Sequence, residues 1–353
     1  LADLHPDRLP AFLRKKKSRR LVTARLDASK AGALRKLMRG HDAVMNALPY
    51  YFNYPVAKLA VTSGLHCADL GGNTQIVQKQ KTLHKAARKQ QVSVIPDCGL
   101  APGMVNIIAA EGIRRVGEAE SVKIYVGGLP QKPEPPLNYQ IVYSLEGALD
   151  YYTTPSWVLR EGRPERVDAL SELEDVRFPA PVGTLEAFHT GGGISTMPWA
   201  YAGKVRTMEY KTLRYPGHVA IMRPVRELGL LSLDPVTVRG VEIVPRDAFI
   251  AAVSPRLTRR NGRDLVALRV EVTGKSGGAR VAWQLLDYYD ESTGISAMMR
   301  TTGFSLAITG VMQVDGRIRS AGVYTPDEAV PFQAYVDELK RRGVEIKEYP
   351  LVQ

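Results

Sequence analysis

The sequence predicts an α/β protein in which a doubly wound parallel sheet is followed by a mixed α+β region with a large sheet. Short apolar strand patterns alternate from the start with helical patterns of about ten to fifteen residues, which is typical of βαβ units. After about residue 117 the strand patterns follow one another closely, which indicates a separate sheet. With 353 residues the chain is longer than one hydrophobic core usually organises, so we expect two domains.

The predicted elements of the first region come in the order that a parallel sheet requires. Residues 1–4 look like the end of a strand, and Pro6 suits the first turn of the helix that follows. Further strands are expected at 21–26, 43–46, 66–69 and 92–95, and helices at 31–38, 55–62, 74–89 and 104–110. Residues 1–117 are therefore predicted to form a Rossmann-type, dinucleotide-binding domain.

The second region is predicted to be an α+β substrate domain over residues 118–293. Strands are expected at 121–126, 139–144, 183–188, 236–244, 265–272 and 280–286, with a proline-rich loop at 130–136 and a helix at 219–228. Two more helices, at 294–312 and 325–342, are expected to return to the first domain as the segment 294–353.

Composition limits the classes of partner. The net charge is +12, and its densest part is the run 14–20, which we interpret as a solvated helix end rather than a nucleic-acid site. No apolar run approaches the roughly eighteen residues of a membrane span. The two cysteines, Cys67 and Cys98, lack CxxC spacing. We expect a cytoplasmic protein with no catalytic metal and no nucleic-acid or membrane partner.

Asp3 is interpreted as the acid that binds the adenine ribose at the end of the second strand of such a sheet. The alternative is an ordinary terminal residue. The strand, glycine-rich turn and helix that should precede this acid, about 25 to 30 residues in all, do not occur in this chain. NAD is predicted rather than NADP, because Asp3 would repel a 2′-phosphate. Arg8 and the run 14–20 are the counterargument, since cations there can accommodate that phosphate.

Other candidate cofactor contacts lie where predicted strands end, because ligands of a doubly wound sheet bind at the carboxyl ends of its strands. Asn46 can offer its amide to a ribose, and a turn-capping role is equally expected for it. Asp69 stands beside the flexible Gly71 and is a candidate to face a substrate amine. With Asp3, the full predicted set is Asp27, Asn46, Ala47, Leu48, Pro49, Asp69, Leu70 and Gly71.

Five motifs carry a resemblance to a known family. They are NALPY at 46–50, ADLGGN at 68–73, PDCGLAPGMVN at 96–106, EAFHTGG at 186–192 and KTLRYPGH at 211–218. Together they make the chain similar to the saccharopine dehydrogenase family, and within it to the lysine 6-dehydrogenase branch. The resemblance implies a cofactor domain, a largely β substrate domain and a C-terminal helical return. The chain departs from the family in the missing phosphate-binding turn.

The substrate-domain motifs supply candidate substrate and catalytic residues. Arg214 can hold a substrate carboxylate with its bidentate fork, and Lys211 and Tyr215 lie beside it in sequence. His189 and His218 are candidate bases because histidine titrates near neutral pH, although a lone histidine is more often structural. Asp69 is the third catalytic candidate, if burial raises its pKa.

The expected reaction is hydride transfer from the ε-carbon of lysine to NAD⁺, followed by hydrolysis of the imine to a semialdehyde that closes to a cyclic imine. One alternative is a reductase that forms a secondary amine, such as saccharopine or carboxynorspermidine. Another is a non-catalytic homologue that serves as a binding subunit. We expect a homo-oligomer, a dimer or higher.

Overall fold

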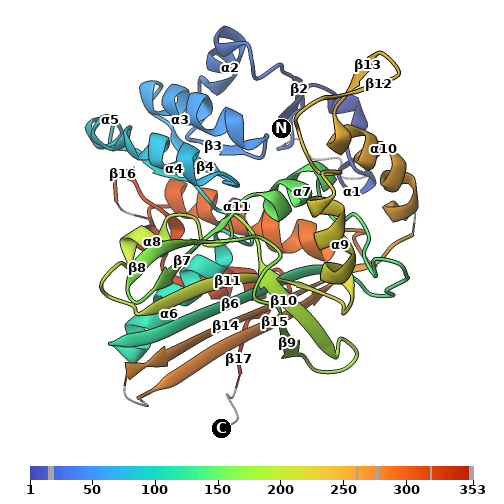
Figure 1. The fold of residues 1–353 in the computed structure, drawn as a ribbon. Coiled ribbons are helices and arrows are strands. Elements are labelled where there is room, and N and C mark those ends of the chain that lie inside the picture. Colours follow the sequence, from blue (N-terminus) through green and yellow to red (C-terminus); the bar gives the residue numbers. More distant parts are fainter. Residues whose placement is uncertain (15–19, 260, 276–277, 319, 350–353) are drawn as a thin grey trace. The chain divides into compact units, whose positions relative to one another are not determined.

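The computed structural model describes residues 1–14, 20–259, 261–275, 278–318 and 320–349 (Figure 1). The chain divides into two compact units. The first consists of 1–107, 289–295 and 299–344, and the second of 108–288, 296–298 and 345–353. Most of the basic run at 14–20 lies outside the described residues. The predicted domain boundaries at residues 117 and 293 stay a prediction.

The first unit contains the predicted parallel sheet. Its strands lie in the order β16 (Gly322–Val323), β5 (Ser93–Ile95), β4 (His66–Asp69) and β3 (Ala43–Asn46), and every neighbouring pair is parallel. A separate parallel pair is formed by β1 (Ala2–Asp3) and β2 (Ala24–Arg25). The prediction of a Rossmann-like parallel sheet is confirmed.

Helices follow the strands of this unit. They are the short η1 (Pro6–Arg8), α1 (Ala11–Arg14) and η2 (Tyr50–Phe52), with α2 (Ala31–Met38), α3 (Asn53–Thr62), α4 (Thr74–Lys81) and α5 (His84–Lys89). Apolar residues of α2, α3, β4 and β5 share one core, including Leu34, Val56, Cys67 and Val94. The single helix predicted at 74–89 is wrong, because α4 ends where the Thr82 hydroxyl donates to the Lys79 carbonyl at 2.6 Å.

Late helices contribute to the same unit. They are α11 (Ala297–Val314), α12 (Pro326–Ala329) and α13 (Phe332–Arg341). The Gln313 amide donates to the carbonyls of Cys67 at 3.1 Å and Ser93 at 3.0 Å, which fixes the end of α11 to β4 and β5. The helix predicted at 325–342 is interrupted at Pro331, which has no N–H to continue it.

The second unit is built on a nine-stranded mixed sheet, so the prediction of a large sheet is confirmed. Its main path runs β17 (Lys347–Glu348), β15 (Arg280–Tyr288), β14 (Asp264–Gly274), β6 (Ala119–Pro130), β11 (Thr207–Arg214), β10 (Thr184–His189) and β9 (Glu174–Arg177). β7 (Ser156–Arg160) pairs with β11 and with β8 (Arg163–Val167). The pair β6–β11 is parallel.

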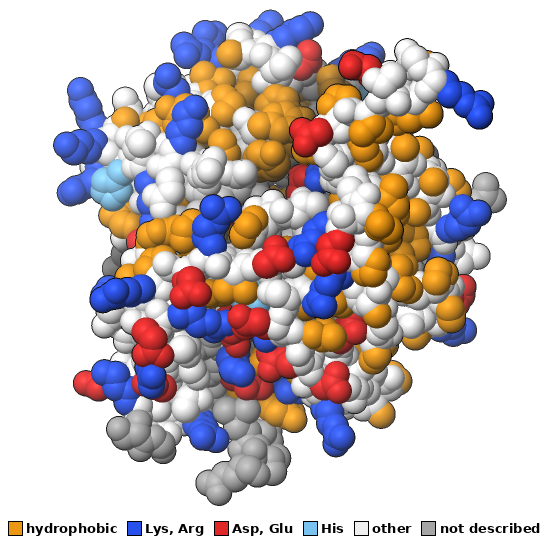
Figure 2. Space-filling model, viewed as in Figure 1, with side chains coloured by type: hydrophobic (Ala, Val, Ile, Leu, Met, Phe, Trp, Pro, Cys, Tyr) orange, Lys and Arg blue, Asp and Glu red, His pale blue; other side chains and the backbone are white. Residues whose placement is uncertain are grey.

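The two faces of this sheet carry different cores, because side chains alternate along each strand. Leu185, Ala187 and Leu213 point to one face. Phe188 points to the other, where it packs with α7 (Leu145–Thr153), α9 (His218–Glu227) and α10 (Pro245–Leu257). α6 (Met104–Val116) and the short α8 (Met197–Ala200) complete the helices that bear on this unit. In the face that Figure 2 shows, acidic and basic side chains are interspersed over the sheet.

Two strand predictions in this region differ from the structure. Residues 139–144 form no strand. Their Tyr139 ring packs edge-on against His218, and the Ile141 N–H donates to the Leu257 carbonyl, so tertiary contacts override the local β propensity. The predicted strand 236–244 is instead a hairpin of β12 (Val236–Val238) and β13 (Val241–Ile243), which turns at Arg239 and Gly240.

Candidate functional site

A hydrogen-bonded network organises the strand ends of the first unit around Asp69. The Asp69 carboxylate accepts from the Asn53 amide at 3.0 Å, the Gln80 amide at 2.6 Å and the Gly71 N–H at 2.8 Å. Asn53 in turn accepts from the Asn46 amide at 2.8 Å. The network therefore ties β3, β4, α3 and α4 together at the edge where ligands of a doubly wound sheet bind.

Burial raises the pKa of Asp69 to about 6, although the hydrogen bonds from Gln80, Gly71 and the Asp97 N–H oppose that rise. The side chain has no exposed surface, and both carboxylate oxygens are engaged. Through these contacts the Asp69 carboxylate holds the end of β4 against α3 and α4. Its predicted role as a base facing the substrate amine stays a prediction.

Two glycines of the predicted motifs are required by close backbone approach. Gly71 has φ +70°, and a Cβ there would lie 1.9 Å from Oδ1 of Asp97. Gly103 has φ +131°, and a Cβ there would lie 2.2 Å from the Gly99 carbonyl oxygen. The ADLGGN and PDCGLAPG motifs therefore meet in space, as two turns packed against each other at the ends of β4 and β5.

The remaining candidate cofactor residues lie at the ends of β1, β2, β3 and β4. Asp3 is exposed and accepts from the His5 N–H at 2.8 Å. Asp27 accepts from the Ser29 hydroxyl at 2.6 Å and the Ser29 N–H at 3.0 Å, and these bonds lower its pKa. Asn46 is buried and accepts from the Leu48 N–H, while Ala47, Leu48 and Pro49 are exposed and Leu70 is half-buried.

A cavity of about 440 Å³ lies in the first unit, and Ala28 and Ser29, which follow Asp27 in sequence, are part of its lining. Residues of α2 and α3 with the loops before them line it, and they are mostly apolar: Ala28, Ser29, Ala31, Leu34, Arg35, Phe52, Tyr54, Pro55, Val56, Lys58, Leu59 and Thr62. Its size is within the range of ligand pockets.

In the second unit, the buried Arg214 is held by neutral groups. Its Nε donates to the Tyr152 hydroxyl at 3.1 Å, and Nη1 donates to the Leu213 carbonyl at 2.9 Å. The guanidinium also lies over the Tyr139 ring, 4.9 Å from its centroid. The side chain is therefore fixed at the end of β11 by two hydrogen bonds and a cation–π contact.

His218 completes this arrangement from the first turn of α9. Its Nδ1 lies 3.1 Å from the Leu137 carbonyl, so this nitrogen carries the proton, and Nε2 accepts from the Tyr152 hydroxyl at 3.0 Å. Burial, reinforced by the charge of Arg214, lowers the pKa of His218 to about 3. His218 is thus a neutral group that orients Tyr152, and through it Arg214.

Within the described part of the chain, no carboxylate lies within 4.0 Å of the Arg214 guanidinium. Glu186 is its cross-strand neighbour, yet the Glu186 carboxylate accepts from the backbone N–H groups of Gly217 at 3.0 Å and Val219 at 2.6 Å. The N–H groups at the N-terminus of α9 therefore stabilise the negative charge of the Glu186 carboxylate. The partners described for the buried Arg214 guanidinium are therefore uncharged: a hydroxyl, a carbonyl and an aromatic ring.

Lys211, Tyr215 and His189 lie on the opposite face of the sheet from Arg214. Residues 211, 213 and 215 share one face of β11, and His189 is the cross-strand partner of Lys211. Lys211 donates to Glu174 at 2.8 Å, and the Tyr215 hydroxyl donates to the Pro130 carbonyl at 3.1 Å. The structure thus brings Arg214 and His218 together and separates both from the other three.

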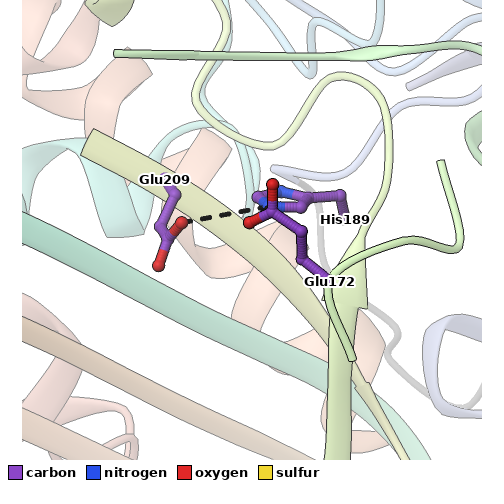
Figure 3. Close-up of side chains that lie close together, drawn as sticks. All are labelled: Glu172, His189 and Glu209. Carbon is purple, nitrogen blue, oxygen red and sulfur yellow. Dashed lines mark hydrogen bonds and ion pairs between the residues drawn. The ribbon is translucent and has the colours of Figure 1, made fainter. Parts of the chain in front are cut away.

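His189 belongs to a cluster of charged side chains (Figure 3). Its Nε2 lies 3.1 Å from Glu172 and 3.9 Å from Glu209, and its Nδ1 lies 3.2 Å from the Tyr210 carbonyl. Burial lowers the pKa of His189, although Glu172 opposes that effect. The ring itself is fully buried, whereas 46% of the Glu172 side chain is exposed. The buried ring therefore contacts a carboxylate that is partly exposed.

The donor atoms of Glu172, His189 and Glu209 lie within 4.8 Å of one another, as the ligands of a metal ion would. However, Arg160 donates to Glu172 at 2.7 Å and to Glu209 at 2.8 Å. Lys123 lies 3.8 Å from Glu209 as well. These cations already balance the carboxylates, so the arrangement is a charge-balanced network.

Two family models match the chain in sequence. The model described as the saccharopine dehydrogenase C-terminal domain matches residues 99–344, and that described as the saccharopine dehydrogenase NADP binding domain matches residues 1–95. The chain belongs to the saccharopine dehydrogenase family. The family resemblance predicted from the motifs is therefore confirmed, whereas the lysine 6-dehydrogenase branch stays a prediction.

Relatives from this family are distant in sequence. The mitochondrial alpha-aminoadipic semialdehyde synthase of Bos taurus is 23% identical over 88% of this chain, which spans 41% of that protein's length. The saccharopine dehydrogenase [NADP(+), L-glutamate-forming] of Schizosaccharomyces pombe is 21% identical, over 92% of this chain and 87% of its own.

A solved structure of this family has the same fold. The apo saccharopine dehydrogenase (L-Glu forming) of Saccharomyces cerevisiae matches with a TM-score of 0.75 at 21% identity, over 94% of this chain and 89% of its own. None of the helices in the described ranges is long and apolar enough to cross a membrane.

Several residues around the saccharopine dehydrogenase motifs were not predicted from the sequence. Tyr152 and Glu186 set the environment of Arg214, and Glu172 and Glu209 that of His189. Glu186 and Glu209 could have been found from strand alternation, since each shares a face with a predicted residue on its own or a paired strand. Tyr152 and Glu172 carry no such signal, because a helix and a loop bring them to the sheet.

Proposed function

We propose that this chain is a nicotinamide-dependent dehydrogenase that oxidises the ε-amine of L-lysine and binds the substrate's α-carboxylate through Arg214. The observation that carries the proposal is the buried Arg214 guanidinium, held by Tyr152 and Tyr139 with no carboxylate within 4.0 Å in the described ranges. A buried cation costs free energy unless an anion or hydrogen-bond acceptors compensate it. A substrate carboxylate supplies that compensation and gains two charge-assisted hydrogen bonds.

The number of such cations favours lysine as the substrate. Among the described Lys and Arg side chains with less than a tenth of their surface exposed, Arg214 alone has no carboxylate oxygen within 4.0 Å. Lysine carries one carboxylate, whereas saccharopine carries three. One buried guanidinium matches the smaller anion.

The described residues fit the adenine and ribose parts of a nicotinamide dinucleotide in their chemistry. Asp3 and Asp27 offer carboxylates to ribose hydroxyls, and the cavity between α2 and α3, whose lining begins at Ala28, offers apolar walls to an adenine ring. The exposed segment 47–49 follows the end of β3, and the turn at Gly71 follows the end of β4. When bound, the cofactor accepts a hydride from the substrate carbon. We favour NAD on the strength of the Asp3 carboxylate.

The protein's part in the reaction is to orient the substrate and to accept a proton. The amine must be neutral before its carbon can release a hydride, so a base takes one ammonium proton. His218 is a poor base because its pKa lies near 3 and its Nε2 already accepts from Tyr152. His189 lies on the face of the sheet opposite Arg214, and its two ring nitrogens face the Tyr210 carbonyl and Glu172, so it does not meet the amine of a lysine held by Arg214. Asp69, whose pKa is raised to about 6 by burial, is the remaining candidate. Water then replaces ammonia at the imine carbon.

Cleavage of saccharopine with NADP⁺ is the second candidate. It is favoured by the relatives, which include a saccharopine dehydrogenase [NADP(+), L-glutamate-forming], and by the match of residues 1–95 to the saccharopine dehydrogenase NADP binding domain. Arg25, the parallel-register neighbour of Asp3, offers a cation to a 2′-phosphate.

The test is reduction of NAD⁺ and NADP⁺ by the purified protein, measured with L-lysine, with saccharopine and with no substrate. We expect reduction of NAD⁺ with lysine, together with release of one ammonia per reduced cofactor. Turnover with saccharopine and NADP⁺ but not with lysine would replace the first candidate by the second. No turnover with either substrate would contradict both.

A further inference from the structure

The Tyr139 side chain is held by its ring and not by its hydroxyl. The Arg214 guanidinium lies over the ring, 4.9 Å from its centroid, and the ring is edge-on to His218 with 5.6 Å between the two centroids. The side chain is only 3% exposed, and among the described residues the Tyr139 hydroxyl has no hydrogen-bond partner. Buried tyrosine hydroxyls normally find a partner, because an unpaired buried donor costs free energy.

Tyr152, which also contacts Arg214, has a fully engaged hydroxyl. It donates to Nε2 of His218 at 3.0 Å and accepts from Nε of Arg214 at 3.1 Å. Phenylalanine at position 139 would make the same two ring contacts as Tyr139, since neither the cation–π contact nor the edge-on contact involves the hydroxyl. The contacts that the structure describes therefore give the Tyr139 hydroxyl no structural role.

The Tyr139 hydroxyl and the Arg214 guanidinium are both available as donors. Burial raises the pKa of Tyr139 to about 12, although the charge of Arg214 opposes that rise, so the hydroxyl keeps its proton at neutral pH. Arg214 donates through Nε and Nη1 to acceptors of the protein, and no acceptor for Nη2 is found in the described ranges. A neutral donor and a charged donor thus lie side by side in a buried place.

The two donors are close enough to share one anion. The guanidinium carbon lies 4.9 Å from the centroid of the ring that carries the hydroxyl. The hydroxyl oxygen therefore lies within roughly 8 Å of that carbon, a span that one carboxylate bridges with hydrogen bonds of about 2.8 Å, one from each donor.

We propose that Tyr139 is a specificity-determining residue whose hydroxyl donates to one oxygen of the substrate carboxylate while Arg214 binds the other; this inference rests on the proposed function. A ligand without a carboxylate leaves both donors buried and unpaired, so the site discriminates against simple amines. The cavity that Tyr139 lines with Tyr152 and His218 measures about 10 Å³. The carboxylate therefore needs room, which a shift of the irregular segment 137–144 would provide.

The test is isothermal titration calorimetry of the full chain with L-norleucine, at saturating NAD⁺ and without cofactor. Norleucine keeps the α-carboxylate of lysine and lacks the ε-amine, so its binding is measured without turnover. We expect at least tenfold weaker binding of norleucine to Tyr139→Phe than to the wild type. Pentylamine, which is norleucine without the carboxylate, should bind both proteins equally weakly.

Tyr335→Phe is the matched control, because Tyr335 is also fully buried but its hydroxyl donates to the Ser305 hydroxyl at 2.7 Å. We expect this variant to bind norleucine as the wild type does and to unfold at a lower temperature. Tyr139→Phe should unfold at the same temperature as the wild type or a higher one, since it loses a hydroxyl that has no partner within the described residues. A loss of affinity without a loss of stability is a result that a structural hydroxyl would not give.

Three results would overturn the proposal: no binding of norleucine to the wild type, equal affinity in Tyr139→Phe, or a lower unfolding temperature for Tyr139→Phe, which would show that the hydroxyl has a partner within the protein. Norleucine binding that depends on Tyr139 in a protein that does not oxidise lysine would support the carboxylate site and contradict only the proposed reaction.

Discussion

Two buried charged groups, Asp69 in the first unit and Arg214 in the second, are stabilised in different ways. The Asp69 carboxylate accepts hydrogen bonds from Asn53, Gln80 and Gly71, so its lone pairs are engaged within its own unit. Arg214 is oriented by one hydroxyl, one carbonyl and one aromatic ring. The comparison teaches that a saturated buried charge positions the backbone around it, whereas a charge held only by dipoles retains capacity for a ligand.

The largest expected effect is on proton transfer, and it separates the candidate bases of the two units. Asp69→Asn should lower kcat by about 10²–10⁴-fold if this carboxylate accepts the amine proton. His189→Asn is the control and should lower kcat by no more than a few-fold, since its ring lies on the face of the sheet opposite Arg214. Turnover is measured at saturating lysine and cofactor. A loss of only a few-fold in Asp69→Asn would show that this carboxylate is structural, and a large loss in His189→Asn would contradict the placement of the substrate on Arg214.

The next effect concerns the first unit. Gly71→Ala should reduce the free energy of unfolding by about 1–3 kcal/mol, because φ is +70° and the new methyl group would overlap the Asp97 carboxylate. Gly64→Ala is the matched control, since φ there is +73° and nothing lies within 4 Å of the added Cβ. Urea denaturation measures both. Equal losses in the two variants would mean that the contact with Asp97 contributes nothing.

A smaller effect is expected in the pH dependence of stability. The folded pKa of His218, about 3, is below its ordinary value of 6.5, so between these values the unfolded chain binds a proton that the folded chain does not. This group therefore makes stability fall as pH is lowered through that window, by at most about 1.4 kcal/mol per pH unit. Urea denaturation from pH 7 to pH 4 should show a shallower slope for His218→Asn than for the wild type. Identical slopes would mean that the folded protein binds the proton on His218 as readily as the unfolded chain does, and that burial does not lower its pKa.

Much of the fold was predictable because local signals agree with the tertiary structure. The strands at 43–46 and 66–69 were predicted with the limits that the structure has, since each is a short strand pattern that alternates with helical patterns. The segment 139–144 was mispredicted because Tyr139 packs on His218, a contact across 79 residues that no local pattern encodes.

The candidate site was predictable only in part. Arg214 and His218 lie four residues apart in one motif, and the hydroxyl of Tyr152 joins them in the structure. Tyr152 is 62 residues from Arg214 in sequence, so no motif could link the two. Lys211 and Tyr215 lie close to Arg214 in sequence, and strand alternation sends them to the other face. The motif therefore identified Arg214 as the candidate carboxylate-binding residue, whereas the residues that contact it depend on the pairing and alternation of the strands.

The central claim, that Arg214 binds the α-carboxylate of the substrate, is tested most directly by comparing lysine with 1,5-diaminopentane, which lacks that carboxylate. The kcat/KM of both amines is measured for the wild type and for Arg214→Lys, which keeps the charge and loses the bidentate fork. We predict that the wild type prefers lysine by about 10–100-fold, equivalent to roughly 1.5–3 kcal/mol, and that Arg214→Lys loses most of this preference with little change for the diamine. A preference for lysine that is unchanged in Arg214→Lys would contradict the account.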